Sequence, residues 1–308
     1  MSEFERDQIF DGPTLRVYRT RSPRPKHDRV VFTFHGWARQ PKFSPVGFGE
    51  GFFANQGVDA IHFLTNKNNW YQQPEMREAI AHVTPIANAY AGRSSYGSSM
   101  GGYAAILFSD WLNVDVVSAF SPQFSIQRSI LPNERRWLKE SLETEFLYDD
   151  MASMASKTAK VLVAYDPTDD DDIPHMRLLR STIVNLREFV TPLSSHHVLR
   201  FLHEIGLLSE FLDSSVRGEL DHSHFRTRIR TLRRTSSFYF STAAVKCAQR
   251  SWLAKADALL ELFDALPVKR PPAVVRADKA RELIEARRAL PRQQLKTLGR
   301  RGAPEEEE

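Results

Sequence analysis

Short apolar runs of strand length recur along the first two thirds of the chain. Residues 14–20 alternate between apolar and polar side chains, whereas residues 29–34 form a nearly continuous run of Val, Phe and Thr. Alternation is typical of a strand with one exposed face, and a continuous apolar run is typical of a strand buried on both faces. Further runs of strand length lie at 58–64, 93–98, 114–120, 159–165 and 186–190.

Segments with helical spacing separate these runs. The first begins at Pro74, a residue type favoured in the first helical turn, and acidic side chains follow it; we expect Pro85 to kink or end this helix. Further helices are predicted at 100–112, 175–184 and 197–212. Strands that alternate with helices predict a mostly parallel sheet with helices on both faces, which is an α/β fold.

The remainder of the chain has a different character and predicts a second region. Residues 225–234 form a basic connector, 239–266 is rich in Ala and Leu with helical periodicity, and 279–290 predicts a further short helix. The run Lys269-Arg-Pro-Pro272 is expected to separate the two helical parts. We therefore divide the chain into an α/β domain at 1–222 and a helical C-terminal region at 223–308, whose acidic end, 305–308, we expect to be disordered.

Composition excludes several classes of protein. Of the 308 residues 42% are hydrophobic, which is too many for a disordered chain, and no apolar run approaches the roughly 20 residues of a membrane span. The N-terminal sequence MSEFERDQIF has no apolar segment of the secretory type, so we expect a cytoplasmic protein. Cys247 is the one cysteine, which rules out an intrachain disulfide and a cysteine-based metal site.

Charge separates the two regions more sharply than composition does. The chain carries a net charge of +4, yet residues 1–222 hold 23 basic and 28 acidic side chains, whereas 223–308 hold 19 basic and 10 acidic ones. An acidic body of −5 and a basic tail of +9 predict that the tail docks on the body. A protein partner bound through 223–290 is the alternative. We do not expect nucleic acid, because the aromatic platforms of single-strand binders are missing.

The strongest chemical signal is the run Gly97-Ser-Ser99-Met100-Gly101 between a predicted strand and a predicted helix. This is a Gly-x-Ser-x-Gly pattern, in which a sharp turn lifts the central serine above the sheet and small neighbours let strand and helix pass closely. We predict that Ser99 is a nucleophile. The backbone N–H of Met100, at the start of the helix, is predicted to donate to an oxyanion. Upstream, the strand at 29–34 ends in His-Gly-Trp37, and the Trp37 backbone N–H is the predicted second donor.

These motifs, followed by an acidic turn and a later histidine, resemble the α/β-hydrolase superfamily over about residues 8–212. The resemblance implies a Ser, acid, His triad in that chain order and an α/β-hydrolase fold. For the acid, matching Ile173-Pro174 to the apolar-Pro pair of the superfamily favours Asp170. Asp169 and Asp172 remain open.

The remaining site assignments follow from the same resemblance. His196 takes the place of the superfamily's Gly-His, so it is the predicted base, with His197 as its alternate. Asp166 is expected to cap its own turn. The resemblance places a lid at 123–157, whose apolar residues favour a substrate with a hydrophobic part. From their position after the strand at 58–64, Trp70 and Tyr71 are predicted to reach the substrate pocket, and packing in the core is the alternative.

The sequence thus predicts a serine hydrolase that cleaves an ester or related acyl bond of a small molecule through an acyl-enzyme. No metal and no organic cofactor is expected. Two alternatives remain: an acyltransferase that uses the same acyl-enzyme, and a catalytically silent scaffold that binds a partner through its basic tail.

Overall fold

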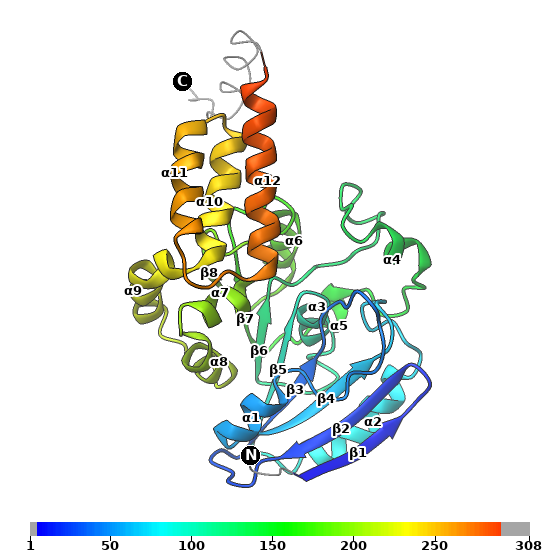
Figure 1. Cartoon of the computed structure of the whole chain (residues 1–308). Helices are drawn as coiled ribbons and strands as arrows, with labels where there is room; N and C mark the ends of the chain where they lie inside the picture. The colour runs from blue at the N-terminus through cyan, green and yellow to red at the C-terminus, as the bar shows by residue number, and fades with distance from the viewer. Residues whose placement is uncertain (1–4, 291–308) are drawn as a thin grey trace.

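The computed structural model describes residues 5–290, and the acidic end at 305–308 lies outside them (Figure 1). One sheet of eight strands runs through this part of the chain in the order β1-β2-β4-β3-β5-β6-β7-β8. The first two pairings, β1 with β2 and β2 with β4, are antiparallel, and the others are parallel. The strands are β1 (Glu5–Asp11), β2 (Leu15–Arg21), β3 (Arg29–Phe34), β4 (Asp59–Thr65), β5 (Gly92–Ser98), β6 (Val116–Phe120), β7 (Lys160–Tyr165) and β8 (Leu186–Val190).

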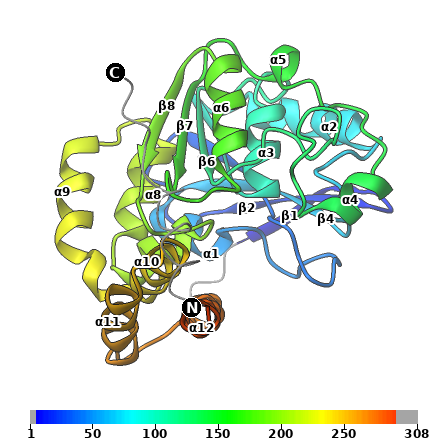
Figure 2. The ribbon, with the colours of Figure 1, turned by 90° about the horizontal axis from the view of Figure 1, so that it is seen from above.

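Helices cover both faces of this sheet, because successive side chains of its inner strands point to opposite sides. In β3, Val30 and Phe32 belong to one apolar core and Val31 to the other. Figure 2 shows the resulting layers on either side of the strands. The first core includes α2 (Met76–Ala87), α3 (Met100–Leu107), α5 (Met151–Met154) and α6 (Ile173–Thr182). The second core includes α1 (Glu50–Gln56), α7 (Val198–Glu204), α8 (Leu208–Val216) and α9 (His222–Leu232).

The C-terminal helices pack on the second face. They are α10 (Ser237–Gln249), α11 (Leu253–Asp264) and α12 (Pro271–Arg288). Phe238 and Ala244 of α10 belong to the same apolar core as Phe201 of α7. Lys246 of α10 also forms an ion pair of 2.6 Å with Asp170 on the loop after β7. Both apolar packing and an ion pair therefore attach the basic C-terminal helices to the α/β domain.

The predicted α/β fold class is confirmed, and the strand order with its elbow between β5 and α3 is α/β-hydrolase-like. Several predicted element boundaries were wrong. The connector at 225–234 lies largely in α9, and the stretches 197–212 and 239–266 are each two helices, broken near Gly206 and Ser251, whose φ angles are +71° and +59°. The Pro-Pro pair opens α12 instead of only interrupting the chain, because proline is tolerated in a first turn.

Pro85 lies inside α2, which continues to Ala87. Among the described residues, no helix combines the length and the apolar character that crossing a membrane requires.

Candidate active site

Ser99 lies in a strained turn between the end of β5 and the start of α3. Its φ and ψ angles are +56° and −124°, in a region that residues with a side chain rarely occupy. A Cβ atom on Gly97 would lie 2.1 Å from the carbonyl oxygen of Gly101, and one on Gly101 would lie 2.2 Å from that of Phe34. Only glycine therefore fits at positions 97 and 101, two residues before and two residues after the serine. The local sequence forces the Ser99 side chain out above the sheet edge.

His196 approaches Ser99 from the loop between β8 and α7. Its Nε2 atom lies 2.9 Å from Ser99 Oγ. The Asp166 carboxylate holds this loop by accepting hydrogen bonds from the backbone N–H groups of Leu193, at 3.0 Å, and Ser195, at 2.6 Å. Asp166 also accepts from the Thr168 N–H in its own turn. It thus caps the acidic turn, as predicted, and in addition joins that turn to the histidine loop.

Asp172, and not Asp170, is the carboxylate beside His196. Both Asp172 oxygens lie 2.9 Å from His196 Nδ1. Asp170 is exposed and pairs with Lys246, so the first choice for the acid does not reach the histidine. Asp169 accepts a hydrogen bond from the Asp171 backbone N–H. The structure brings together Ser99, His196 and Asp172 from the predicted set.

Arg136 fixes the position of the Asp172 side chain. Its Nη1 donates to Asp172 Oδ1 at 2.7 Å, and its Nη2 donates to the Asp171 carbonyl at 2.9 Å. Burial of Asp172 alone would raise the pKa of its carboxyl, but the charges and hydrogen bonds of His196 and Arg136 outweigh it and hold that pKa well below its usual range. Asp172 therefore stays ionised although its side chain is only 1% exposed.

Glu134 and His175 extend this network. Glu134 lies 2.7 Å from Arg136 Nη2 and 2.8 Å from His175 Nε2, and the backbone N–H of Phe124 donates to His175 Nδ1. Glu134, Arg136 and Phe124 all belong to the predicted lid at 123–157. Part of that segment thus supports the Asp172 loop.

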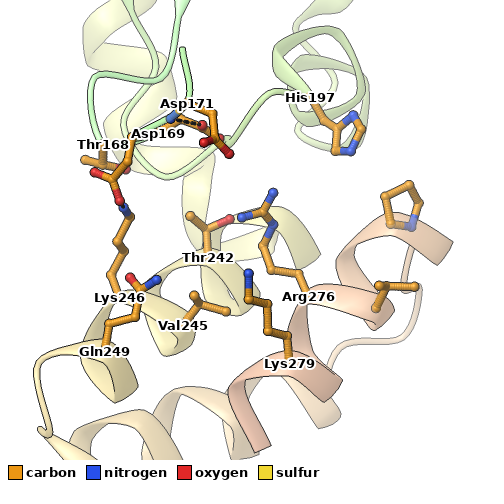
Figure 3. Close-up of a pocket in the computed structure, with 13 residues that line it drawn as sticks. Thr168, Asp169, Asp171, His197, Thr242, Val245, Lys246, Gln249, Arg276 and Lys279 are labelled. Carbon is orange, nitrogen blue, oxygen red and sulfur yellow. Dashed lines mark hydrogen bonds and ion pairs between the residues drawn. The ribbon is translucent and has the colours of Figure 1, made fainter. Parts of the chain in front are cut away.

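His197, the alternate base, lines the cleft over Ser99 as well as a cavity beside the C-terminal helices, but the histidine hydrogen-bonded to Ser99 Oγ is His196. Burial, and after it the nearby charge of His196, lowers the pKa of His197 to about 3, so its imidazole stays neutral. Its ring lies 5.3 Å from that of Phe238 in α10. The cavity beside the C-terminal helices is charged and has a volume of about 650 Å³. Figure 3 shows Asp169 and Asp171 on one side of this cavity and Arg276 and Lys279 of α12 on the other.

A cleft of about 730 Å³ lies over Ser99 and His196. Trp37 and Trp137 line it, as does Pro272 from the first turn of α12. The loop at 35–37 passes close to the elbow, since a Cβ atom on Gly36 would lie 3.1 Å from the Ser98 carbonyl oxygen. The Met100 N–H, at the first position of α3, has no acceptor within its own helix. Met100 thus directly follows Ser99, and Trp37 lines the same cleft as Ser99; the role of their N–H groups as oxyanion donors stays a prediction.

Trp70 and Tyr71 are fully buried and do not line this cleft. The Tyr71 hydroxyl donates to the carbonyl of His35, and the Trp70 indole donates to Gln123 Oε1 at 3.2 Å. Gln123 Nε2 in turn lies 3.3 Å from Ser99 Oγ. Both aromatic residues thus pack in the core and support residues near the serine, so the predicted place in the substrate pocket is wrong and the core alternative is correct.

Sequence reasoning missed Gln123 and Arg136. Gln123 follows the end of β6, at the same sheet edge as Ser99, which is a position where functional residues of parallel sheets gather. Arg136 carried no such signal, because it lies in a segment of irregular structure. Within residues 5–290, no group of three His, Cys, Asp or Glu side chains is arranged to hold a metal ion.

No protein-family model and no curated protein matches the sequence. Solved structures of similar shape include the capsule O-acetyltransferase of Neisseria meningitidis serogroup A, at 13% identity and a TM-score of 0.46, covering 72% of this chain and 93% of that one. A lidless α/β serine hydrolase from Xanthomonas campestris matches at 17% identity and a TM-score of 0.48, covering 71% and 96%. Est1E from Butyrivibrio proteoclasticus matches at 15% and 0.47, covering 69% and 99%.

Proposed function

We propose that the protein is a serine hydrolase that cleaves an ester or related acyl bond through Ser99, His196 and Asp172. One observation carries the proposal: hydrogen-bonding distances of 2.9 Å link Ser99 Oγ to His196 Nε2 and His196 Nδ1 to Asp172. In this arrangement the histidine can remove the serine proton while the carboxylate keeps the ring in the required tautomer.

The reaction begins when Ser99 Oγ attacks the substrate carbonyl carbon and passes its proton to His196 Nε2. The carbonyl oxygen becomes an oxyanion, which the N–H groups of Met100 and Trp37 stabilise. When this tetrahedral intermediate collapses, the bond to the leaving group breaks, and the leaving group takes the proton from His196. Water then attacks the acyl-enzyme by the same steps in reverse, releasing the acid and restoring Ser99.

Asp172 and its partners prepare the histidine for both proton transfers. The ionised carboxylate stabilises the imidazolium that forms in each step, and it does not itself take the proton. Arg136 restrains the carboxylate, and Gln123 restrains the Ser99 hydroxyl at 3.3 Å. Neither residue changes its charge in the cycle. Both act by reducing the number of arrangements available to the reacting groups.

The test is covalent labelling with a fluorophosphonate, together with turnover of p-nitrophenyl acetate. Wild-type protein should be labelled at Ser99 and should hydrolyse the ester, and Ser99→Ala should lose both while its thermal unfolding stays unchanged. Ser129→Ala is the matched control, because Ser129 is exposed on the 123–157 segment and distant in sequence from the elbow. Turnover by Ser99→Ala at the wild-type rate would refute the proposal.

A further inference from the structure

A third cavity, of about 420 Å³, lies beside the cleft over Ser99. It lies between helices α1, α7 and α8 and the residues that enter α12. We call it the side pocket. Its apolar lining residues are Phe48, Phe52, Tyr96, Leu199, Leu208, Leu212 and Pro271.

Gly49 lines the side pocket, and its backbone packs closely on two aromatic rings. Its φ is +75°, and a Cβ atom there would lie 3.0 Å from the Phe53 ring and 3.3 Å from the Tyr96 ring. The Phe48 and Tyr96 rings stack at 4.9 Å with an interplanar angle of 10°. The aromatic wall is therefore packed and preformed.

The side pocket adjoins the cleft. Phe48, Leu199 and Arg200 line both cavities. A group that leaves the Ser99 region past Phe48 and Leu199 therefore enters an apolar space. These shared side chains favour a chain of the substrate as the occupant of the side pocket.

Apolar surface in a concave, water-accessible site is unfavourable unless a ligand covers it, and such pockets are typical of substrate sites. We infer that the side pocket binds an apolar arm of the substrate whose carbonyl is attacked by Ser99. This inference rests on the proposed hydrolase activity and names its substrate class: esters that carry an extended apolar acyl or alkyl chain.

The basic tail completes this pocket. Pro271 lines it, and the neighbouring Arg270 places its Nη2 atom 3.0 Å from His203 Nδ1 on α7. Pro272, the next residue, lines the cleft. The start of α12 therefore forms a wall of both cavities. Of the predicted lid, Trp137 lines the cleft, whereas Leu142 is exposed and lines neither cavity.

Chain-length profiles test the inference. One series uses p-nitrophenyl acetate, butyrate, octanoate and decanoate, and the other uses acetates of ethanol, butanol and octanol. We expect kcat/KM to rise at least about tenfold from the shortest to the octyl member of one series, since each buried methylene adds to binding. A rise in the first series places the acyl chain in the side pocket, and a rise in the second places the alcohol chain there.

Variants of residues in and outside the side pocket test whether this pocket causes the preference for long chains. Leu208→Trp changes a position that lines the side pocket and not the cleft. It should lower the long-to-short ratio of kcat/KM, measured in the series that shows the preference, by about tenfold or more. Leu208→Phe, a smaller change, should lower it less and serves if the tryptophan variant does not fold. Leu142→Trp introduces the same side chain on exposed α4 (Leu138–Glu143) and should leave the ratio within about twofold of wild type.

The outcomes separate the two proposals. If turnover depends on Ser99 but both series are flat or fall with length, the side pocket does not bind an apolar arm and the hydrolase assignment stands. A length preference that Leu208→Trp leaves unchanged likewise overturns the inference. If no ester is turned over in a Ser99-dependent manner and no fluorophosphonate label appears, both proposals are wrong.

Discussion

Arg136 and His196 bind the same oxygen of one carboxylate. Arg136 Nη1 lies 2.7 Å from Asp172 Oδ1, and His196 Nδ1 lies 2.9 Å from that atom. The arginine side chain is 21% exposed and the aspartate 1%, so the pair is largely removed from water. Because buried charges are stable only when paired, the Asp172 carboxylate and Arg136 depend on each other.

Replacing Arg136 should therefore impair catalysis through Asp172. We expect Arg136→Gln to lower kcat by about tenfold or more while KM stays within about threefold, because Asp172 is free to rotate and orients His196 less well. Arg136→Lys, which keeps the charge but not the two-point contact, should restore part of kcat. Steady-state kinetics on p-nitrophenyl esters gives both constants.

Arg135→Gln is the matched control for this change. Arg135 is the exposed neighbour of Arg136, so its variant should keep both constants within about twofold. A kcat for Arg136→Gln equal to that of the control would show that Arg136 has no positioning role.

The choice among the clustered aspartates is tested by a pair of variants. Asp172→Asn should reduce kcat by roughly 10⁴-fold, because the amide no longer selects the productive tautomer of His196. Asp170→Asn should keep kcat within about twofold, since Asp170 is exposed and pairs with Lys246, and surface ion pairs contribute little. The reverse ranking would place Asp170 in the triad.

The contrast between Ser99 and Asp172 shows what the sequence could predict. Glycines two residues to either side of Ser99 shape its turn, so the pattern at 97–101 was sufficient to find it. Asp172 is one of several carboxylates in a short loop, and matching Ile173-Pro174 to a superfamily pattern favoured Asp170. Its selection depends on Arg136, which lies 36 residues away and meets it only in the folded chain.

Aromatic residues posed a similar difficulty. Trp70 and Tyr71 follow β4 at the sheet edge where the site lies, yet both have positive φ angles and fully buried side chains. Spacing along the chain does not encode that turn. The side pocket could not be predicted from the sequence either. Its walls come from α1, α7, α8 and the start of α12, which meet only through the tertiary packing.

The close approach at the elbow predicts a large loss of stability on adding a methyl group. We expect Gly97→Ala to lower the free energy of unfolding by more than about 3 kcal/mol, because its Cβ would lie 2.1 Å from a backbone carbonyl oxygen that cannot move independently. Gly51→Ala on α1 makes the same change where no other group lies within 4 Å, and it should stabilise the protein by about 0.5–1 kcal/mol. Urea unfolding compares the two, and equal effects would contradict the geometry at the elbow.

Glu134 predicts how stability depends on pH. Burial opposes its charge, but hydrogen bonds from His175 and Arg136 outweigh burial and lower the pKa of its carboxyl from 4.5 to about 2. A carboxyl whose pKa is lower in the folded state stabilises the protein fully above pH 4.5, and this contribution is lost as the pH falls from 4.5 toward 2. Wild type should therefore exceed Glu134→Gln in unfolding free energy at neutral pH. The difference should narrow by about 1.4 kcal/mol per pH unit below 4.5.

Denaturant unfolding of both proteins at a series of pH values measures this difference directly. Glu140→Gln is the control, because Glu140 is in the same segment and its carboxylate accepts a hydrogen bond from the Trp37 indole rather than from a cation. The difference in unfolding free energy between wild type and this control should change with pH less than the difference for Glu134→Gln, because the partner of Glu140 is a neutral indole and not a buried guanidinium. If the difference in unfolding free energy between wild type and Glu134→Gln does not change with pH, Glu134 is not ionised against Arg136 in the folded protein.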